Sequence, residues 1–212
     1  MRKTLILIFT LAFVCVTLFA QKAEVQQAVD RYKNMNTLTA AVTRTRHNAA
    51  VTRDVVTRGH FYFKKPGRMC MRFNEGKDML LMDGNTFVMV TDGKKSVAKG
   101  EGNNQFESLL AVFKSLASGG DADADVDLSE LANMDISKRD NICTLTIIPL
   151  APDEKAKRKL MFTSFVLTLD LRLSELISLR MNEKGDNYTQ YDFSDYVFDG
   201  AVSDSVFNPQ SL

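Results

Sequence analysis

The stretch GHFYFKKPGRMCMRFNEGKDMLLMDGNTFVMVTDGK, residues 59–94, consists of short apolar runs separated by turn residues. Within most runs apolar and other side chains alternate, and a period of two places successive side chains on opposite faces of a β-strand. Pro66-Gly67, Asp83-Gly84-Asn85 and Asp92-Gly93 lie between the runs, where such residues favour tight turns. The stretch therefore predicts a meander of antiparallel strands with an apolar face.

The same two-residue period recurs on both sides of this meander. Alternation begins at Thr37 and returns over 51–65, and later strand patterns cover 141–150, 160–171, 175–182 and 188–197. Apolar side chains at helical spacing predict amphipathic helices over 22–36 and 106–116, and the sequence also predicts a short helix over 128–131. Together these elements predict a mainly β, α+β fold: a curved antiparallel sheet that forms an incomplete β-barrel covered by amphipathic helices.

Composition and charge narrow the possible functions. The chain of 212 residues has 27 Lys and Arg against 26 Asp and Glu, which removes the basic surface typical of a nucleic-acid-binding protein. Two histidines, no G-x-S-x-G segment and no phosphate-binding loop leave little material for hydrolytic or nucleotide chemistry. We therefore expect a protein that is not an enzyme, binds no nucleic acid and needs no cofactor or metal. We also expect it to be a monomer.

The first twenty residues have the order of a secretory signal peptide. Arg2 and Lys3 precede an apolar run over 5–19, and Ala20 stands at the cleavage position. The run is shorter than the ~20 residues that a membrane-spanning helix needs. We therefore expect residues 1–20 to be a cleaved signal peptide and residues 21–212 to be a single exported domain. Cys15 raises the alternative that the protein is anchored to a membrane by a lipid on this cysteine. Val14 before it does not fit a lipidation motif.

Several motifs follow one another in a characteristic order. The aromatic run 61–63 leads to Lys64-Lys65-Pro66, to the run 69–73 and to the hairpin sequence 82–87. Farther on come a hairpin over 177–189 and the closing elements 192–196, DFSDY, and 206–209, VFNP. In this order the motifs resemble the LolA-like periplasmic lipoprotein carriers, and the resemblance covers nearly the whole chain after residue 20.

The resemblance implies an incomplete antiparallel barrel, closed by helices, whose apolar interior holds the acyl chains of a lipoprotein during transit from the inner to the outer membrane. It also implies an inner-membrane ABC-type release complex and an outer-membrane acceptor as partners, and no enzymatic activity. In the family a basic residue before the turn proline, usually arginine, and a nearby aromatic serve lid closure and cargo transfer. Here these positions hold Lys65 and Met69. Lysine lacks the planar five-donor fork of arginine, so a lid held by bidentate hydrogen bonds would be built differently.

The meander supplies the residues for an acyl-chain site. Methionine suits such a site because its flexible thioether adapts to varied apolar surfaces. The alternative is an ordinary methionine-rich core, because alternation identifies a buried face without saying what covers it. The predicted acyl-binding residues are Phe61, Phe63, Met69, Met71, Phe73, Met79, Leu81, Phe87 and Met89. The predicted lid and transfer residues are Lys65, Pro66, Val29, Tyr32, Phe106, Leu110 and Phe113.

Other features leave alternatives open. The acidic run 121–127 partly resembles a calcium loop but lacks its glycine and glutamate, which favours a solvated loop. Cys70 and Cys143 are either buried free thiols or a disulfide. A sensor or scaffold that uses the same fold to bind a protein partner is the second functional hypothesis. Six arginines give the early strands a positive bias, which predicts a solvated outer face or steering toward anionic lipid: Arg44, Arg46, Arg53, Arg58, Arg68 and Arg72.

Overall fold

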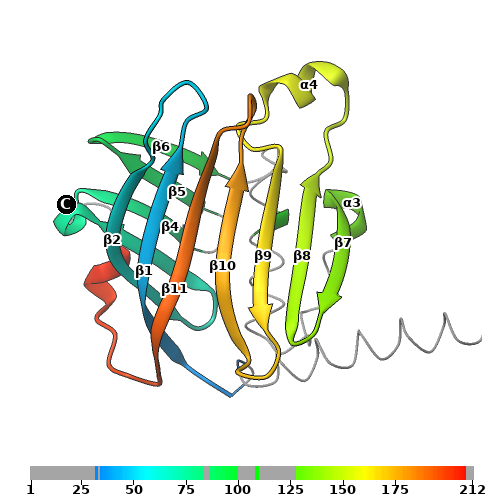
Figure 1. Cartoon of the computed structure of the whole chain (residues 1–212). Coiled ribbons are helices and arrows are strands. Elements are labelled where there is room, and N and C mark those ends of the chain that lie inside the picture. Colours follow the sequence, from blue (N-terminus) through cyan, green and yellow to red (C-terminus); the bar gives the residue numbers. More distant parts are fainter. Residues whose placement is uncertain (1–31, 33, 84–85, 100–107, 110–127, 209–212) are drawn as a thin grey trace, which may run out of the picture.

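Eleven antiparallel strands form one sheet in the computed structural model, which describes residues 32, 34–83, 86–99, 108–109 and 128–208. Their order across the sheet is β6-β5-β4-β3-β2-β1-β11-β10-β9-β8-β7 (Figure 1). The strands are β1 (Thr37–His47), β2 (Val55–Lys64), β3 (Arg68–Phe73), β4 (Asp78–Asp83), β5 (Thr86–Thr91), β6 (Lys94–Lys99), β7 (Ala132–Arg139), β8 (Ile142–Pro149), β9 (Ser164–Asp170), β10 (Glu175–Asn182) and β11 (Tyr188–Phe198).

The first and last strands meet in the middle of the sheet. β1 pairs with β2 on one side and with β11 on the other, so the two halves of the chain form one continuous surface. β6 and β7 are the two edges of the described sheet, and they do not pair with each other. The sheet curves so that β3 to β6 cross behind β1 and β2 (Figure 1). The prediction of a mainly β, open and antiparallel fold is therefore confirmed.

The described helices are short. They are η1 (Asn74–Gly76), α3 (Leu128–Leu131), α4 (Glu154–Lys159) and η2 (Asp204–Phe207). The short helix predicted over 128–131 is confirmed as α3, whereas α4 was not predicted. Only Tyr32, 34–36, Ser108 and Leu109 of the two predicted covering helices belong to the described residues. A helical cover over the sheet therefore stays a prediction.

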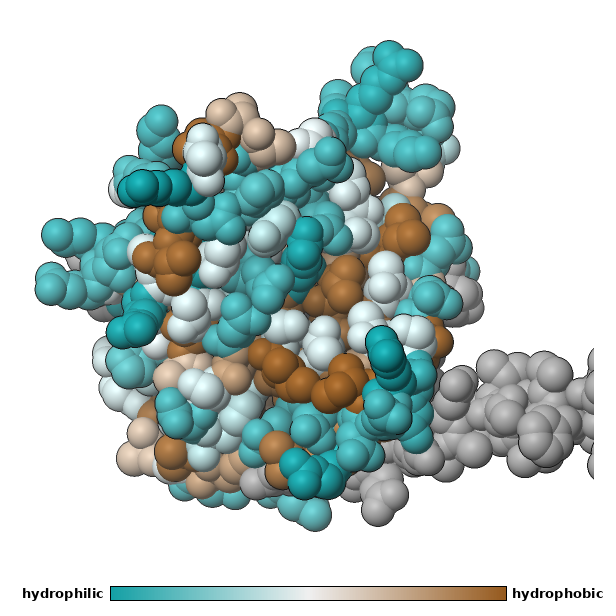
Figure 2. All heavy atoms as spheres, viewed as in Figure 1, coloured by the Kyte–Doolittle hydropathy of each residue, from teal (hydrophilic) through white to brown (hydrophobic). Residues whose placement is uncertain are grey.

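The two faces of the sheet carry different apolar clusters. The larger cluster lies on the face inside the curve, which we call the interior face. The opposite, outer face carries a smaller cluster formed by Cys70, Met79, Leu81, Val88, Val90 and Phe207. Over β1 and β8 to β11, the outer face mixes hydrophilic and hydrophobic side chains (Figure 2).

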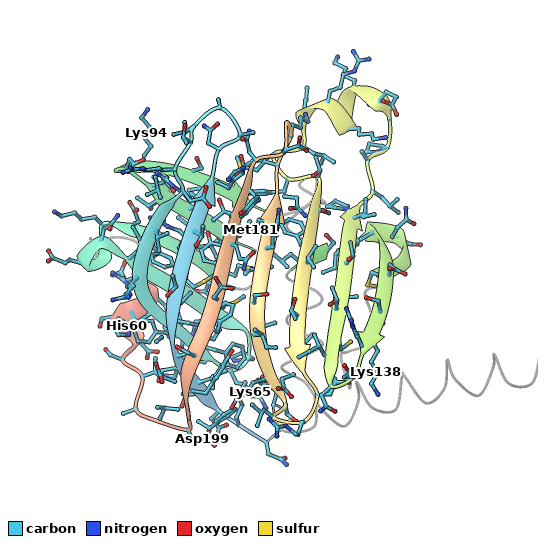
Figure 3. The ribbon with its side chains drawn as sticks, viewed as in Figure 1. His60, Lys65, Lys94, Lys138, Met181 and Asp199 are labelled. Carbon is cyan, nitrogen blue, oxygen red and sulfur yellow. The ribbon has the colours of Figure 1, made fainter. Side chains whose placement is uncertain are left out.

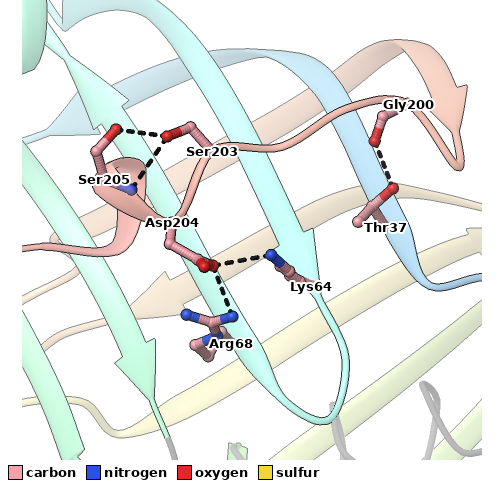
Figure 4. A network of polar contacts seen from close by, with 7 residues as sticks. All are labelled: Thr37, Lys64, Arg68, Gly200, Ser203, Asp204 and Ser205. Carbon is pink, nitrogen blue, oxygen red and sulfur yellow. Dashed lines mark hydrogen bonds and ion pairs between the residues drawn. The ribbon is translucent and has the colours of Figure 1, made fainter.

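The segment after β11 covers the outer cluster. Asp204, which precedes Ser205 in η2, accepts hydrogen bonds from Lys64 Nζ and Arg68 Nη2, both at 2.8 Å (Figure 4). The Arg68 guanidinium lies 4.9 Å from the centre of the Phe207 ring. Arg72 Nε donates to the carbonyl of Val206 at 2.9 Å. These contacts hold Phe207 against the outer cluster. Cys70 belongs to this cluster and is fully buried.

Phe207→Ala should therefore loosen the outer cluster and expose Cys70. We expect a loss of ~3–5 kcal/mol of unfolding free energy, as for other buried phenylalanines.

Burial raises the pKa of the Cys70 thiol to about 11, although Arg72 opposes the shift, so the thiol reacts slowly in the parent protein. With Cys70 as the sole cysteine, the variant should react faster with a thiol reagent. A chain with Cys143 as the sole cysteine is the control, and its labelling should stay slow. Equal Cys70 labelling with and without Phe207 would contradict this packing.

Candidate functional site

Seven of the nine predicted acyl-binding residues lie together on the interior face. Phe61 and Phe63 of β2 stand opposite Met71 and Met69 of β3, and Phe87 of β5 stands opposite Met82 of β4. Six of the seven are buried, and Met89 is partly buried against the same cluster. The seven residues are Phe61, Phe63, Met69, Met71, Phe73, Phe87 and Met89.

The remaining two predicted residues, Met79 and Leu81, lie on the outer face. In β4 the interior positions are instead held by Leu80 and Met82. The predicted acyl-binding set contains neither Leu80 nor Met82, because residues 79–82 are all apolar and both faces of β4 are buried. A strand buried on both faces shows no alternation, so only its register with β3 assigns the faces. We therefore leave Met79 and Leu81 out of the proposed acyl-binding surface.

The second half of the chain extends the same apolar surface. The rings of Phe61 and Phe193 meet edge to face across β1, with their centres 5.3 Å apart. Met181 of β10 is almost fully buried in the interior cluster (Figure 3). The interior face is therefore one apolar surface that runs through the seam between β1 and β11. Its main members from the second half are Ile147, Phe165, Leu167, Leu169, Leu179, Met181 and Phe193.

Of the lid residues predicted on the two covering helices, Tyr32 is the one that lies within the described residues. Its hydroxyl accepts a hydrogen bond from the backbone N–H of Leu176 at 3.2 Å, and Tyr196 Oη donates to the carbonyl of Leu176. The register of β10 with β9 shifts between Leu176 and Ser178, and its pairing with β11 begins at Ser178. Two tyrosines therefore bind the backbone at this irregularity. The hydrogen bond to Tyr32 holds the segment before β1 against β10. Val29, Phe106, Leu110 and Phe113 lie outside the described residues.

Lys65 and Pro66 form the turn between β2 and β3. The N–H of Lys65 donates to the carbonyl of Asn36 at 2.9 Å, which joins this turn to the chain that enters β1. The peptide bond between Lys65 and Pro66 is cis, Lys65 is half-buried and Pro66 is exposed. Figure 3 shows Lys65 at the same end of the sheet as Asp199. The turn thus adjoins the segment that contains Tyr32, and its role in transfer stays a prediction.

A buried ion pair lies at the opposite end of the interior face. Arg44 of β1 follows Leu38, Ala40 and Val42 in the inward positions, and its Nη2 lies 2.7 Å from Asp78 Oδ2 of β4. Both side chains are at most 6% exposed. The Arg44 guanidinium also lies 4.5 Å from the centre of the Phe73 ring.

The sequence predicted Arg44 to be on the outer face with the other arginines, and this is wrong. The two-residue period that starts at Leu38 places it inward, and its charge is compensated by a partner that is 34 residues away in the sequence. The carboxylate of Asp78 also accepts hydrogen bonds from Asn74 Nδ2 at 2.7 Å and from the Asp92 N–H at 3.0 Å. Arg68 and Arg72 are engaged too, by the segment after β11.

This environment makes the charged form of Asp78 the favoured one. Burial is the largest effect and raises the pKa, but the hydrogen bonds from Arg44, the Asp92 N–H and Asn74, together with the Arg44 charge, outweigh it and lower the pKa. The ionised carboxylate therefore stabilises the fold above the unfolded-state pKa of ~3.9. This stabilisation is lost as the pH falls through the lower folded-state pKa.

Asp78→Asn should consequently change the acid limb of the stability profile. We expect the variant to be less stable than the parent at neutral pH and to lose less stability between about pH 6 and about pH 3. Urea unfolding of both proteins across this range measures the difference. Parallel profiles would show that Asp78 does not titrate as this geometry requires.

The described residues offer little for catalysis or metal binding. His47 Nδ1 lies 2.7 Å from Asp54 Oδ1 in the loop between β1 and β2, and His60 is exposed. Cys70 and Cys143 are both free and buried, and they belong to the outer and the interior cluster respectively. Across the described ranges, no three histidine, cysteine or acidic side chains gather as a metal site. The acidic run 121–127 lies outside those ranges. No helix in the described part of the chain is long and apolar enough to cross a membrane.

Comparison with known proteins agrees with this architecture. The chain matches the family model described as outer membrane lipoprotein carrier protein LolA over residues 33–210. No curated protein matches it. Similar solved structures include a LolA superfamily protein from Nitrosomonas europaea, with 9% identity, a TM-score of 0.42 and coverage of 90% of this chain and 98% of that chain. A putative outer membrane lipoprotein-sorting protein domain from Vibrio parahaemolyticus has 12% identity, a TM-score of 0.43 and coverage of 88% and 96%.

A third similar structure is the MucA/MucB complex of Pseudomonas aeruginosa, with 12% identity, a TM-score of 0.37 and coverage of 88% of this chain and 59% of that chain. At these scores the three structures resemble the chain only distantly. An open antiparallel sheet with an apolar interior face is an architecture that can hold an apolar ligand. The family match covers most of the sequence, and the chain belongs to the LolA family.

Proposed function

We propose that this protein is a periplasmic carrier that binds the acyl chains of lipoproteins on its interior face and shuttles them from the inner to the outer membrane. One observation carries the proposal: seven of the nine residues predicted from sequence gather with the apolar side chains of β8 to β11 on one continuous face. Each methylene buried there contributes about 0.8 kcal/mol, so even part of an acyl chain would bind tightly.

Binding also requires release, and the interior face suits both. Met69, Met71, Met82 and Met181 are unbranched and adapt to a chain that enters or leaves between them. The segments predicted to cover the face, with Val29, Tyr32, Phe106, Leu110 and Phe113, would lift to admit the chain. Tyr32 would then leave its hydrogen bond to the N–H of Leu176.

The family match and the sequence support a route for the proposed carrier. Residues 1–20 would direct export and be removed, and residues 21–212 would act as a single domain. The inner-membrane partner would be an ABC-type release complex, and the lipoprotein would pass to an outer-membrane acceptor. The Lys65-Pro66 turn, which lies beside the entry to β1, would take part in this transfer.

The experiment is a titration with a fluorescent triacylated lipopeptide and with the same peptide without its acyl chains. We expect tight binding of the acylated form alone. A second assay adds the protein to inner-membrane vesicles that carry a lipoprotein and an active release complex, and we expect the lipoprotein to appear in the soluble fraction. Binding of neither peptide would show that the interior face is a filled core and would overturn the carrier function.

A scaffold that binds a protein partner is the second candidate, and the edge strand β7 favours it. β7 is an edge of the described sheet and pairs there with β8, and a peptide can add as a further strand at such an edge. Met134 and Ile136 of β7 are 42% and 48% exposed, although Ile147 of β8, opposite Met134, is fully buried. A peptide that binds along β7 and leaves lipopeptide affinity unchanged would support this second function.

A further inference from the structure

The interior face changes from apolar to polar at the end where β1 leads into the β1–β2 loop (Figure 1). In β1 the inward position after Val42 is Arg44, and in β11 the inward position before Phe193 is Tyr191. Arg44 and Tyr191 stand opposite each other in the register of β1 with β11. Both are buried, at 5% and 4% exposure. The last buried positions of these two strands therefore carry polar groups next to the apolar surface.

The hydroxyl of Tyr191 makes no hydrogen bond to any described residue, although the side chain is buried. Its ring packs against Phe73, with the ring centres 5.9 Å apart. The hydroxyls of Tyr32 and Tyr196, by contrast, both bind the backbone of Leu176. Among the described side chains, no polar atom is both fully occluded and without a hydrogen-bond partner. The Tyr191 Oη therefore keeps some accessible surface, where a small polar group can reach it.

At neutral pH this hydroxyl is a hydrogen-bond donor. Burial raises the pKa of Tyr191 to about 12, although the charges of Arg44 and Arg46 oppose the shift. The phenol thus keeps its proton, and a carbonyl oxygen is a suitable acceptor for it. Buried polar groups in proteins are as a rule hydrogen-bonded, so a buried donor without a protein partner points to a partner from outside the chain.

The charges that act on Tyr191 from the described residues balance. Two are positive, Arg44 and Arg46, and two are negative, Asp78 and Glu183. Arg44 is already paired with Asp78 at 2.7 Å. Burial raises the pKa of Glu183, although the nearby charge of Arg46 opposes the shift. With no excess of positive charge to compensate a buried anion, these surroundings favour a neutral polar group over a carboxylate.

We propose that Tyr191 receives the head of an acyl ligand, and that its hydroxyl donates a hydrogen bond to a neutral ester carbonyl there. The acyl chain would then run past Phe193 along the interior face, toward the end that holds Tyr32. The inference rests on the proposed acyl binding. It adds to that function the direction in which the ligand lies and a preference for esters over free fatty acids.

The test is a double comparison of two ligands and three proteins. The ligands are a monoacylglycerol and the alkyl glyceryl ether of the same chain length, which differ in the carbonyl alone. Each competes with the fluorescent triacylated lipopeptide, below its micelle concentration. The proteins are the full chain, Tyr191→Phe and the matched control Tyr62→Phe, which removes a hydroxyl from a half-buried tyrosine against the outer cluster. A fatty acid of the same chain length is the third competitor.

We expect the unmodified protein and the control to bind the ester roughly 3- to 10-fold more tightly than the ether, as one hydrogen bond provides. Tyr191→Phe should lose this preference and bind the ether like the unmodified protein. The fatty acid should compete less well than the ester. Urea unfolding should be unchanged by Tyr191→Phe, because the lost hydroxyl has no hydrogen bond to the described residues.

The outcomes separate this inference from the function on which it rests. An ester preference that survives Tyr191→Phe would overturn the inference alone, and so would a fatty acid that competes better than the ester. Lipopeptide binding without any preference between ester and ether would also overturn it and leave the carrier function standing. A protein that does not bind the lipopeptide at all would overturn both.

Discussion

Removing one partner of the Arg44–Asp78 ion pair is expected to lower the free energy of unfolding by about 3–5 kcal/mol, because it leaves the other charge buried and unpaired. Arg44→Met leaves the Asp78 carboxylate with only the hydrogen bonds from Asn74 and the Asp92 N–H. Asp78→Leu leaves the guanidinium with Thr57 Oγ1, at 2.9 Å, and the face of Phe73. Urea unfolding at neutral pH measures both losses.

The double variant separates the cost of an unpaired charge from the worth of the pair. Replacing both members of a buried ion pair by apolar residues is often close to neutral, so Arg44→Met with Asp78→Leu should regain much of the stability that either single change loses. Asn74 and the Asp92 N–H lose their acceptor in the double variant, so the recovery should be incomplete. A double variant as unstable as the sum of the two single variants would contradict the account of this pair.

The second large effect distinguishes the two faces of the sheet with one chemical change. Met71→Ala on the interior face and Met79→Ala on the outer face remove the same side chain from positions that are at most 1% exposed. Both should lose ~2–5 kcal/mol of unfolding free energy. Only Met71→Ala should weaken lipopeptide binding, by roughly tenfold, because a contact worth about 0.8 kcal/mol per methylene is lost from the acyl chain.

The two variants control for each other. If destabilisation alone reduced binding, the affinities of Met71→Ala and Met79→Ala would fall together. Thermal unfolding fixes the temperature at which both are folded, and the titrations are then done below it. Equal lipopeptide affinities of the two variants would show that acyl chains do not bind on the interior face.

The meander could be predicted well because its side chains alternate and its turns carry the usual residues. β10, predicted over 175–182, has the bounds Glu175–Asn182, and the predicted interior positions of β2 and β3 are all buried. β7 was missed because seven of its eight residues are exposed. An edge strand with a solvated surface has too few buried side chains to show a two-residue period.

The errors at the site have a different cause. Met79 and Leu81 were assigned to the wrong side because β4 is apolar on both faces, and Arg44 because charge was taken as a sign of exposure. Both assignments depend on contacts between distant segments: the register of β4 with β3, and the meeting of β1 with β4 through Asp78. The segment after β11 likewise covers an outer cluster that no local pattern in β3 to β5 reveals.

Photo-crosslinking with a lipopeptide that carries a diazirine in its acyl chain can locate bound acyl chains on the protein directly. Mass spectrometry of the labelled protein locates the attachment. If acyl chains bind on the interior face, we expect labels on interior positions such as Phe63, Met71 and Met181, and we expect competing unlabelled lipopeptide to remove them. Labels on the outer cluster, at Met79 or Leu81, or labels that competitor does not remove, would contradict it.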